Sequence, residues 1–271
     1  MQTKLAVGIV AAFLASAFPI SARQTTTTTA QPQATTLLAQ SVAALTGSAT
    51  ISDVTLSGNA QRIAGSDDES GTVTLKAMAA GESRMDLSLS GGILSEIRTL
   101  DPNNNQIGAW SGTDGVQHAI SNHNLMTDSS WFFPALTLSR LLANANAVAT
   151  YVDQETLNGQ TVLHVSVSQS VAGQTGQGGT LLQHLSQMDF FLDPTSLLPV
   201  ALSFTTHPDN NALLDIPVQI LFSNYQNNGG VLVPLHVQKY INNNLFVDLQ
   251  LQSAALNSGL TASAFNVQVA Q

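Results

Sequence analysis

The sequence predicts an α+β protein built on one strongly curved antiparallel sheet, an incomplete barrel of about 10–12 strands, with two or three short helices on its concave face. Segments in which apolar and polar residues alternate recur through most of the chain, and turns rich in Gly, Asn and Asp separate them. Segments with helical spacing of apolar residues are few and short. A sheet with one apolar face must close into a barrel, fold into a sandwich or pack against helices. We expect the short helices to cover it.

The N-terminus has the pattern of a secretory signal peptide. Lys4 precedes an apolar run over residues 5–18, and the small-residue end Pro19-Ile20-Ser21-Ala22 offers a cleavage site. The run is shorter than the roughly 20 residues of a membrane span, although an uncleaved anchor is the alternative. We therefore expect a signal peptide at 1–22, a Thr/Gln-rich linker at 23–34 and a single domain at 35–271.

Composition excludes several classes of function. The formal net charge is -9, which disfavours nucleic acid as a partner. Charged residues make up only 9% of the chain, against roughly 25% in an average globular domain, so Asn, Gln, Ser and Thr supply the polar surface. The chain has no cysteine, which excludes disulfides, thiol catalysis and cysteine metal sites and suits an exported protein.

Three segments predict helices. The first runs from about Thr35 to Leu45 and ends at Gly47. The second lies within Asp128–Ala145, with Ser129 or Ser130 as a potential N-cap and Pro134 in the first turn. The third, at 180–186, follows a Gly-rich loop.

Strands are expected between these helices and after them. Before the second helix they are residues 48–57, 71–79, 83–90, 93–100, 106–110 and 115–120. After it they are residues 148–155, 161–169, 187–193, 198–206, 216–225, 231–241 and 245–256. Asn158-Gly159 is the strongest hairpin signal, because this dipeptide favours the type I′ turn. The acidic residues Asp67, Asp68 and Glu69 are expected in a solvated loop before a strand.

Three C-terminal motifs carry a resemblance to a known family. They are DPTSLLP at 193–199, FSNYQNNGGVLVPLHVQKY at 222–240 and LNSGLTASAFNV at 256–267. In their order they resemble the turn, the strand pair and the docking tail of the LolA/LolB-like periplasmic lipoprotein carriers. Together with an N-terminal helix after a signal peptide, the resemblance spans most of the chain, although only its last 80 residues or so carry motifs.

The resemblance implies an incomplete barrel with a helical lid around a hydrophobic cavity that carries lipid or the acyl chains of lipoproteins through the periplasm. Relatives with this fold also act as stress sensors that bind lipid and regulate an anti-sigma factor, so an envelope protein is a second candidate partner. Export to the periplasm is expected, with the extracellular space as the alternative, and no cofactor is implied. Arg62 and Arg98 are candidates by position for the lid arginine of the carriers, and a solvated strand arginine is the alternative for each.

Aliphatic and aromatic residues at strand faces and at the second helix are the expected cavity lining. The alternative for all of them is ordinary core packing with no cavity. They are Trp110, Trp131, Phe132, Phe133, Leu136, Met85, Leu87, Phe190, Leu192, Phe204 and Phe222.

No catalytic or metal-binding motif competes with this interpretation. The six histidines are scattered without the spacing of a zinc site, so no metal site is predicted. None of the Ser-hydrolase, zinc-protease, P-loop or dinucleotide patterns occurs, so no catalytic residue is predicted. Asp189 with Asp193, or Asp153 with Glu155, remain the pairs that a secreted hydrolase would use. The other alternative is an envelope interaction or regulatory module of the same fold with a filled core.

Overall fold

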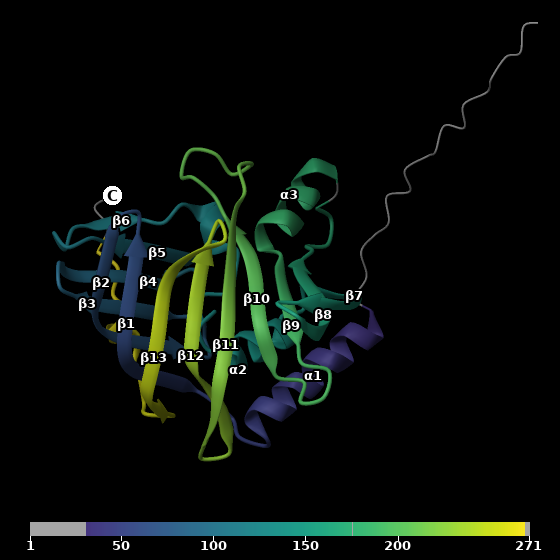
Figure 1. Cartoon of the computed structure of the whole chain (residues 1–271). Coiled ribbons are helices and arrows are strands. Elements are labelled where there is room, and N and C mark those ends of the chain that lie inside the picture. The colour runs from purple at the N-terminus through teal and green to yellow at the C-terminus, as the bar shows by residue number, and fades with distance from the viewer. Residues whose placement is uncertain (1–30, 175, 269–271) are drawn as a thin grey trace, which may run out of the picture.

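The computed structural model describes residues 31–174 and 176–268, which form one sheet of 13 strands with three α-helices and two 3₁₀ helices (Figure 1). The expected signal peptide and residues 23–30 of the expected linker lie outside the described residues. The strands are β1 (Asp53–Ala64), β2 (Asp67–Met78), β3 (Ser83–Leu89), β4 (Gly92–Leu100), β5 (Gln106–Ser111), β6 (Gln117–Ala119), β7 (Ala147–Leu157), β8 (Gln160–Gln169), β9 (Met188–Leu192), β10 (Pro199–Thr206), β11 (Ile216–Asn228), β12 (Val231–Ile241) and β13 (Asn244–Leu256). The helices are α1 (Pro32–Thr46), η1 (Asn122–Leu125), α2 (Pro134–Ala143), α3 (Gly176–Ser186) and η2 (Ala262–Phe265).

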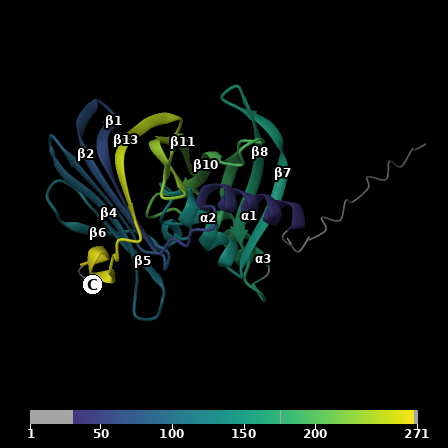
Figure 2. The same cartoon turned by 90° about the horizontal axis from the view of Figure 1, so that it is seen from below.

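Two antiparallel meanders meet in the middle of the sheet, where β1 pairs with β13. Strands β1 to β6 run in chain order to one edge, and β7 to β13 run inward from the other edge. The chain therefore crosses from edge to edge once, between β6 and β7, through η1 and α2. Seen from below, α2 lies between the two sides of the sheet (Figure 2). This crossing places helical residues inside the curve.

Close backbone contact bends the sheet where its two halves join. The pairing of β1 with β13 shifts register between Ser57 and Gly58. A Cβ atom at Gly58 would overlap the carbonyl oxygen of Gln250, so glycine allows the strands to approach here. Register shifts and glycines at such points let a sheet curve.

A single main core lies between the sheet and helices α1 and α2. Leu38 and Leu45 of α1 and Leu136 and Leu138 of α2 are at most 2% exposed. They belong to one cluster with the inward-facing aliphatic residues of both meanders. This arrangement confirms the expected fold class. Each of the 13 segments predicted as strands overlaps one strand of the sheet, so the overall figure of about 10–12 strands was slightly low.

The second helix begins later than predicted, and its predicted N-caps were wrong. The Asp128 carboxylate accepts hydrogen bonds from the backbone N–H and hydroxyl of Ser130 at 2.8 and 2.6 Å, which forms a turn before the helix. Helix α2 then starts at Pro134, a residue that suits the first helical position, after Phe133. The other two helices, by contrast, begin earlier than expected, α1 at Pro32 and α3 at Gly176.

The first hairpin is longer than predicted. Strand β1 ends at Ala64, which pairs with Asp67, the first residue of β2. The acidic residues 67–69 therefore lie in a strand, and the prediction of a loop was wrong. Cross-strand partners stabilise them there, since Gln61 donates to Asp68 at 2.8 Å and Arg62 pairs with Glu69 at 3.3 Å.

The predicted turns are confirmed. Asn158 and Gly159, with φ of 50° and 81°, join β7 to β8. In the 193–199 motif the Asp193 carboxylate accepts hydrogen bonds from the backbone N–H groups of Thr195 and Ser196 at 3.0 and 2.7 Å. These bonds hold the turn that leads into β10.

The last motif docks the chain end onto the first strand. The Asp53 carboxylate accepts hydrogen bonds from the backbone N–H groups of Ser258 and Gly259 at 2.7 and 3.1 Å and from the Ser258 hydroxyl at 2.8 Å. Beyond this anchor Phe265 is fully buried, and η2 contacts β3 and β4. The expected docking tail is thus present.

Candidate functional site

The two sides of the curved sheet enclose a pocket of about 270 Å³. Strands β4 and β5 contribute one wall, strands β10, β11 and β12 the facing wall, and the segment before α2 adds Trp131. In the sheet order these two groups of strands are separated by β3, β2, β1 and β13, so only the curvature brings them together. We call this site the Trp110–Trp131 pocket.

Apolar side chains form slightly more than half of its surface. Trp131, Phe204 and Val218 are 3%, 8% and 2% exposed and pack into the pocket wall. Trp110 lies at the rim, 45% exposed, with its ring stacked on His118 at a centroid distance of 4.5 Å. Such a surface suits an apolar ligand with a limited number of polar contacts.

A cluster of three charges lies in the same pocket. Arg98 is buried and donates through Nε to Glu96 at 3.1 Å and through Nη1 to the Thr127 carbonyl at 3.4 Å. The ammonium nitrogen of Lys239 lies 4.8 Å from the centre of the Trp131 ring. Two cations against one carboxylate leave this cluster with a net positive charge when all three are ionised, while Asp209 supplies a second carboxylate elsewhere in the pocket lining.

The charges adjust one another's ionisation. Burial raises the pKa of Glu96, but the more favourable contacts with Arg98 and Lys239 hold it below its ordinary value. Burial lowers the pKa of Lys239, Glu96 opposes this effect and Arg98 adds to it, so the net pKa is lowered. An anion close to Lys239 would offset the cost of its burial.

A second, larger cleft of about 950 Å³ lies on the other side of η1. Asn124 of η1 lines the Trp110–Trp131 pocket, while Asn122 and Leu125 line the cleft. Arg140 and Asp128, which pair at 3.4 Å, also line the cleft, together with apolar residues such as Met188. The cleft is therefore more polar than the pocket.

The structure places the predicted lining residues in three environments. Trp110, Trp131 and Phe204 meet in the pocket. Phe222 lines a separate cleft of about 550 Å³ near Tyr225, and Met85 is partly buried against the core. The remaining residues pack in the core at 0–2% exposure, namely Phe132, Phe133, Leu136, Leu87, Phe190 and Leu192.

Sequence reasoning missed Lys239 and Glu96, although a signal for Lys239 was present. Alternation along β12 puts Lys239 on the same side as Val237 and Ile241, an inward-facing position. A lysine at such a position is uncommon unless it has a partner. Of the two arginine candidates, Arg98 lines the pocket and is buried, so it is no solvated arginine, whereas Arg62 lies on β1 beside Glu69 and Phe246.

The carboxylates considered for a hydrolase fall into different settings. Asp193 caps its turn, and the Asp153 side chain accepts from the backbone N–H of Gln154 at 2.7 Å. Asp189 and Glu155 contact opposite nitrogens of His164, at 3.1 and 2.9 Å. This arrangement joins β7, β8 and β9 by charge pairs on the sheet surface.

The fold, but not the sequence, matches known proteins. No family model matches the sequence, and no curated protein matches it significantly. A domain from Vibrio parahaemolyticus assigned to outer membrane lipoprotein sorting superposes with a TM-score of 0.54 at 11% identity, over 86% of this chain and 96% of that one. A DUF1329 family protein from Desulfovibrio piger gives 0.50 at 11% identity, over 86% and 96%. A LolA superfamily protein from Nitrosomonas europaea gives 0.49 at 8% identity, over 86% and 97%.

The chain shares its fold with the Vibrio parahaemolyticus domain and the Desulfovibrio piger protein. This likeness in fold agrees with the LolA/LolB-like resemblance drawn from the C-terminal motifs. The motifs also meet physically, since the Tyr225 hydroxyl of the second motif donates to the carbonyl of Pro199 in the first at 2.7 Å. Among the described residues, none of the helices combines the length and apolar composition that a membrane crossing needs.

Proposed function

We propose that this chain is an exported protein that binds the acyl chain of a lipid or lipoprotein and carries it in the cell envelope. It acts as a binding protein rather than an enzyme. In this proposal residues 1–22 are a signal peptide, residues 23–30 belong to a spacer, and the rest forms one binding domain in the periplasm or outside the cell. The LolA-like fold and the lipoprotein-sorting assignment of the Vibrio parahaemolyticus domain support it.

One observation carries the proposal, the position of Lys239 beside the apolar wall of the Trp110–Trp131 pocket. An amphipathic molecule with an apolar chain and an anionic group matches both features. Each methylene removed from water contributes roughly 0.8 kcal/mol, so a few methylenes against Trp131 and Phe204 supply useful affinity. Lys239 and Arg98 would contact the anionic end.

The pocket has room for only part of an acyl chain. Its volume of about 270 Å³ lies just below the range of roughly 300–1,000 Å³ for small-molecule sites. A longer chain would extend into the core as α1 moves, because α1 covers the concave face beside α2, β7 and β12. The helix would then act as the lid that the family resemblance implies.

A second candidate function has a specific observation in its favour. Phe132, Phe133 and Phe190 are fully buried and fill the concave face beneath the helices. A filled core fits an envelope interaction or regulatory module, whose partner would be a protein. Under this alternative the chain would not take up lipid.

Binding of a fluorescent fatty acid tests the proposal. The chain would be purified without detergent, titrated with the probe, and compared with Trp110→Ala, which changes the exposed rim of the pocket. Ile93→Ala is the matched control, because Ile93 is similarly exposed at 56% and lies outside the pocket lining.

Saturable binding that is weakened in Trp110→Ala and unchanged in Ile93→Ala would support the carrier. Native mass spectrometry with lipid analysis of an organic extract would then identify the cargo class. If the purified chain contains no lipid and does not bind the probe, the carrier proposal is wrong and the interaction module is favoured.

A further inference from the structure

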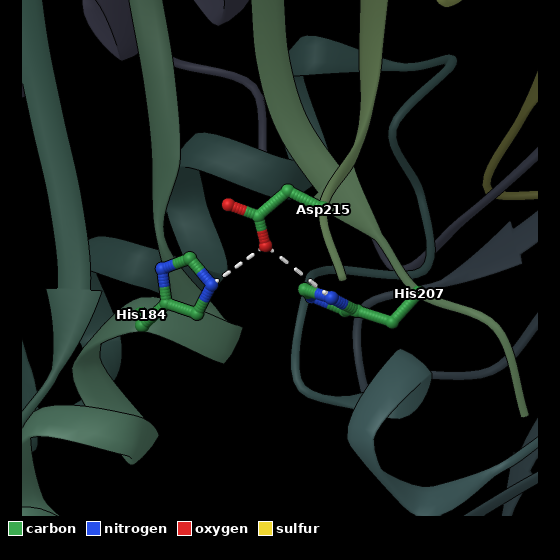
Figure 3. Close-up of side chains that lie close together, drawn as sticks. All are labelled: His184, His207 and Asp215. Atoms are coloured by element: carbon green, nitrogen blue, oxygen red, sulfur yellow. Dashed lines mark hydrogen bonds and ion pairs between the residues drawn. The ribbon is translucent and has the colours of Figure 1, made fainter. Parts of the chain in front are cut away.

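Two histidines and one aspartate from separate segments converge beside α3 (Figure 3). His184 lies in the last turn of α3, His207 directly follows β10, and Asp215 directly precedes β11. The Asp215 Oδ1 atom lies 2.8 Å from His184 Nε2 and 3.5 Å from His207 Nδ1. One potential ligand atom from each residue lies within 4.8 Å of the other two.

This spacing is close to that of a metal site. Zinc binds imidazole nitrogen at about 2.0–2.1 Å and carboxylate oxygen at about 2.0–2.2 Å, so neighbouring ligands of a tetrahedral site lie roughly 3.3–3.5 Å apart. The His207–Asp215 distance already has that value. The His184–Asp215 distance is shorter, but both side chains are partly exposed, at 38% and 46%, and are free to separate by a small rotation.

His207 is the buried member of the cluster. Its side chain is fully buried, whereas those of His184 and Asp215 are 38% and 46% exposed. One ligand position is therefore held by the protein interior, while the other two lie at the surface and can adjust to an ion.

The surroundings also orient the ring. His207 Nε2 lies 3.3 Å from the Thr205 hydroxyl, so that nitrogen has a partner, and Nδ1 faces Asp215 at 3.5 Å. Nδ1 also lies 3.2 Å from the Leu214 carbonyl, and it would give up this hydrogen bond when its lone pair binds a metal. A partner on the second nitrogen is typical of metal-binding histidines. His123 packs edge-on against His207 at a centroid distance of 5.8 Å, but its Nε2 contacts the Pro208 carbonyl at 3.1 Å and it is not part of the three-residue cluster.

We propose that His184, His207 and Asp215 form a binding site for a divalent transition metal of the Zn²⁺ type. Two imidazoles and a carboxylate are a ligand set that Zn²⁺ accepts. The fourth position would open toward an adjoining groove of about 350 Å³, which His184 and Asp215 both line. A bound ion would fix the end of α3 to the connection between β10 and β11. This site does not involve Lys239, so the metal-site proposal does not depend on the proposal of lipid binding.

Zinc titration of the full chain tests the site. The protein would carry no polyhistidine tag, would be treated with a chelator, and would be titrated with ZnCl₂ by calorimetry and by dialysis with metal analysis. His184→Ala and Asp215→Asn remove one ligand each at partly exposed positions. His236→Ala is the matched control, because His236 also pairs with an aspartate, Asp248 at 3.1 Å, but belongs to no three-residue cluster among the described residues.

We expect one Zn²⁺ per chain in the unmodified protein and in His236→Ala, and at least about tenfold weaker binding in His184→Ala and in Asp215→Asn. Circular dichroism of the metal-free variants would check that both remain folded. Nuclear magnetic resonance should show the largest zinc-dependent shifts at His207 Nδ1 and His184 Nε2. Equal zinc affinity in all four proteins, an absence of binding, or zinc shifts at His164 or His236 instead would overturn the proposal.

Discussion

The ammonium group of Lys239 lies 4.8 Å above the ring of Trp131, which joins β12 to the segment that precedes α2. A cation over an aromatic face contributes roughly 0.5–2 kcal/mol, with the larger values in desolvated sites. Glu96 supplies the opposite charge, but Arg98 already pairs with it at 3.1 Å. Lys239 therefore shares the carboxylate of Glu96 with Arg98.

Lys239→Gln tests whether this cation recognises an anionic ligand. Under the proposed function we expect about tenfold weaker binding of a fatty acid, because a charge-assisted contact is lost. Binding of the matching fatty alcohol, which has no negative charge, should not change. Titration of both ligands gives the measurement, with Lys76→Gln on β2 as the control. Equal losses for acid and alcohol would show that Lys239 only shapes the pocket.

Leu136→Ala tests the packing of α2 against the sheet. Leu136 is 2% exposed in the main core, so its truncation should lower the free energy of unfolding by about 2–5 kcal/mol. Urea denaturation followed by circular dichroism measures this change. Leu213→Ala, at a position 77% exposed, should change it little. A loss below about 1 kcal/mol at Leu136 would contradict tight packing and favour an open cavity at this position.

Asp53→Asn tests the anchor of the C-terminal segment. Burial raises the pKa of Asp53, but hydrogen bonds from Ser258, Ser52 and Gly259 outweigh it and lower the net pKa. A lowered pKa stabilises the folded chain above the unfolded value of about 3.9, and this contribution disappears as pH falls through the folded value. The variant should lose about 1–3 kcal/mol at neutral pH.

Urea unfolding of wild type and Asp53→Asn at neutral and acidic pH measures this loss. The difference in free energy of unfolding between the two proteins should shrink as pH falls below about 4. Asp67→Asn, at an exposed hairpin position, is the control and should cost little at either pH. A difference that grows in acid would contradict the anchor.

His164→Gln should show the opposite pH dependence. Burial lowers the pKa of His164, but Asp189 and Glu155 more than offset it, so the net pKa is raised. The charged histidine therefore stabilises the folded chain fully below the unfolded value of about 6.5, and this contribution is lost as pH rises through the folded value. The cost of the substitution should be larger near pH 5.5 than near pH 8.5, and chemical unfolding at both pH values measures it.

His164 also stacks on Phe191 at a centroid distance of 4.6 Å. Loss of this stacking should lower the free energy of unfolding by a similar amount at both pH values. His118→Gln, at an exposed position on β6, controls for the removal of a histidine. A cost of His164→Gln that is the same at both pH values would show that the charge pairs contribute nothing.

The strand pattern was predictable because each strand carries its own signal. Val73, Leu75 and Ala77 alternate with polar residues and are buried as expected. Turn residues such as Asn158-Gly159 need no distant partner to act. The start of α2 was less predictable, since the choice between a cap at Ser130 and a turn depends on the carboxylate of Asp128 and on Pro134 together.

The sequence by itself determined the fold class, the order of strands along the chain and the C-terminal motifs, because these depend on periodicity and local turn chemistry. The tertiary structure alone decided which residues share a site. Lys239 meets Trp131, and His207 meets His184 and Asp215, only because the sheet curves and the β10–β11 connection returns to α3. Distances between residues far apart in the chain follow from strand pairing and curvature, which no spacing within the sequence records.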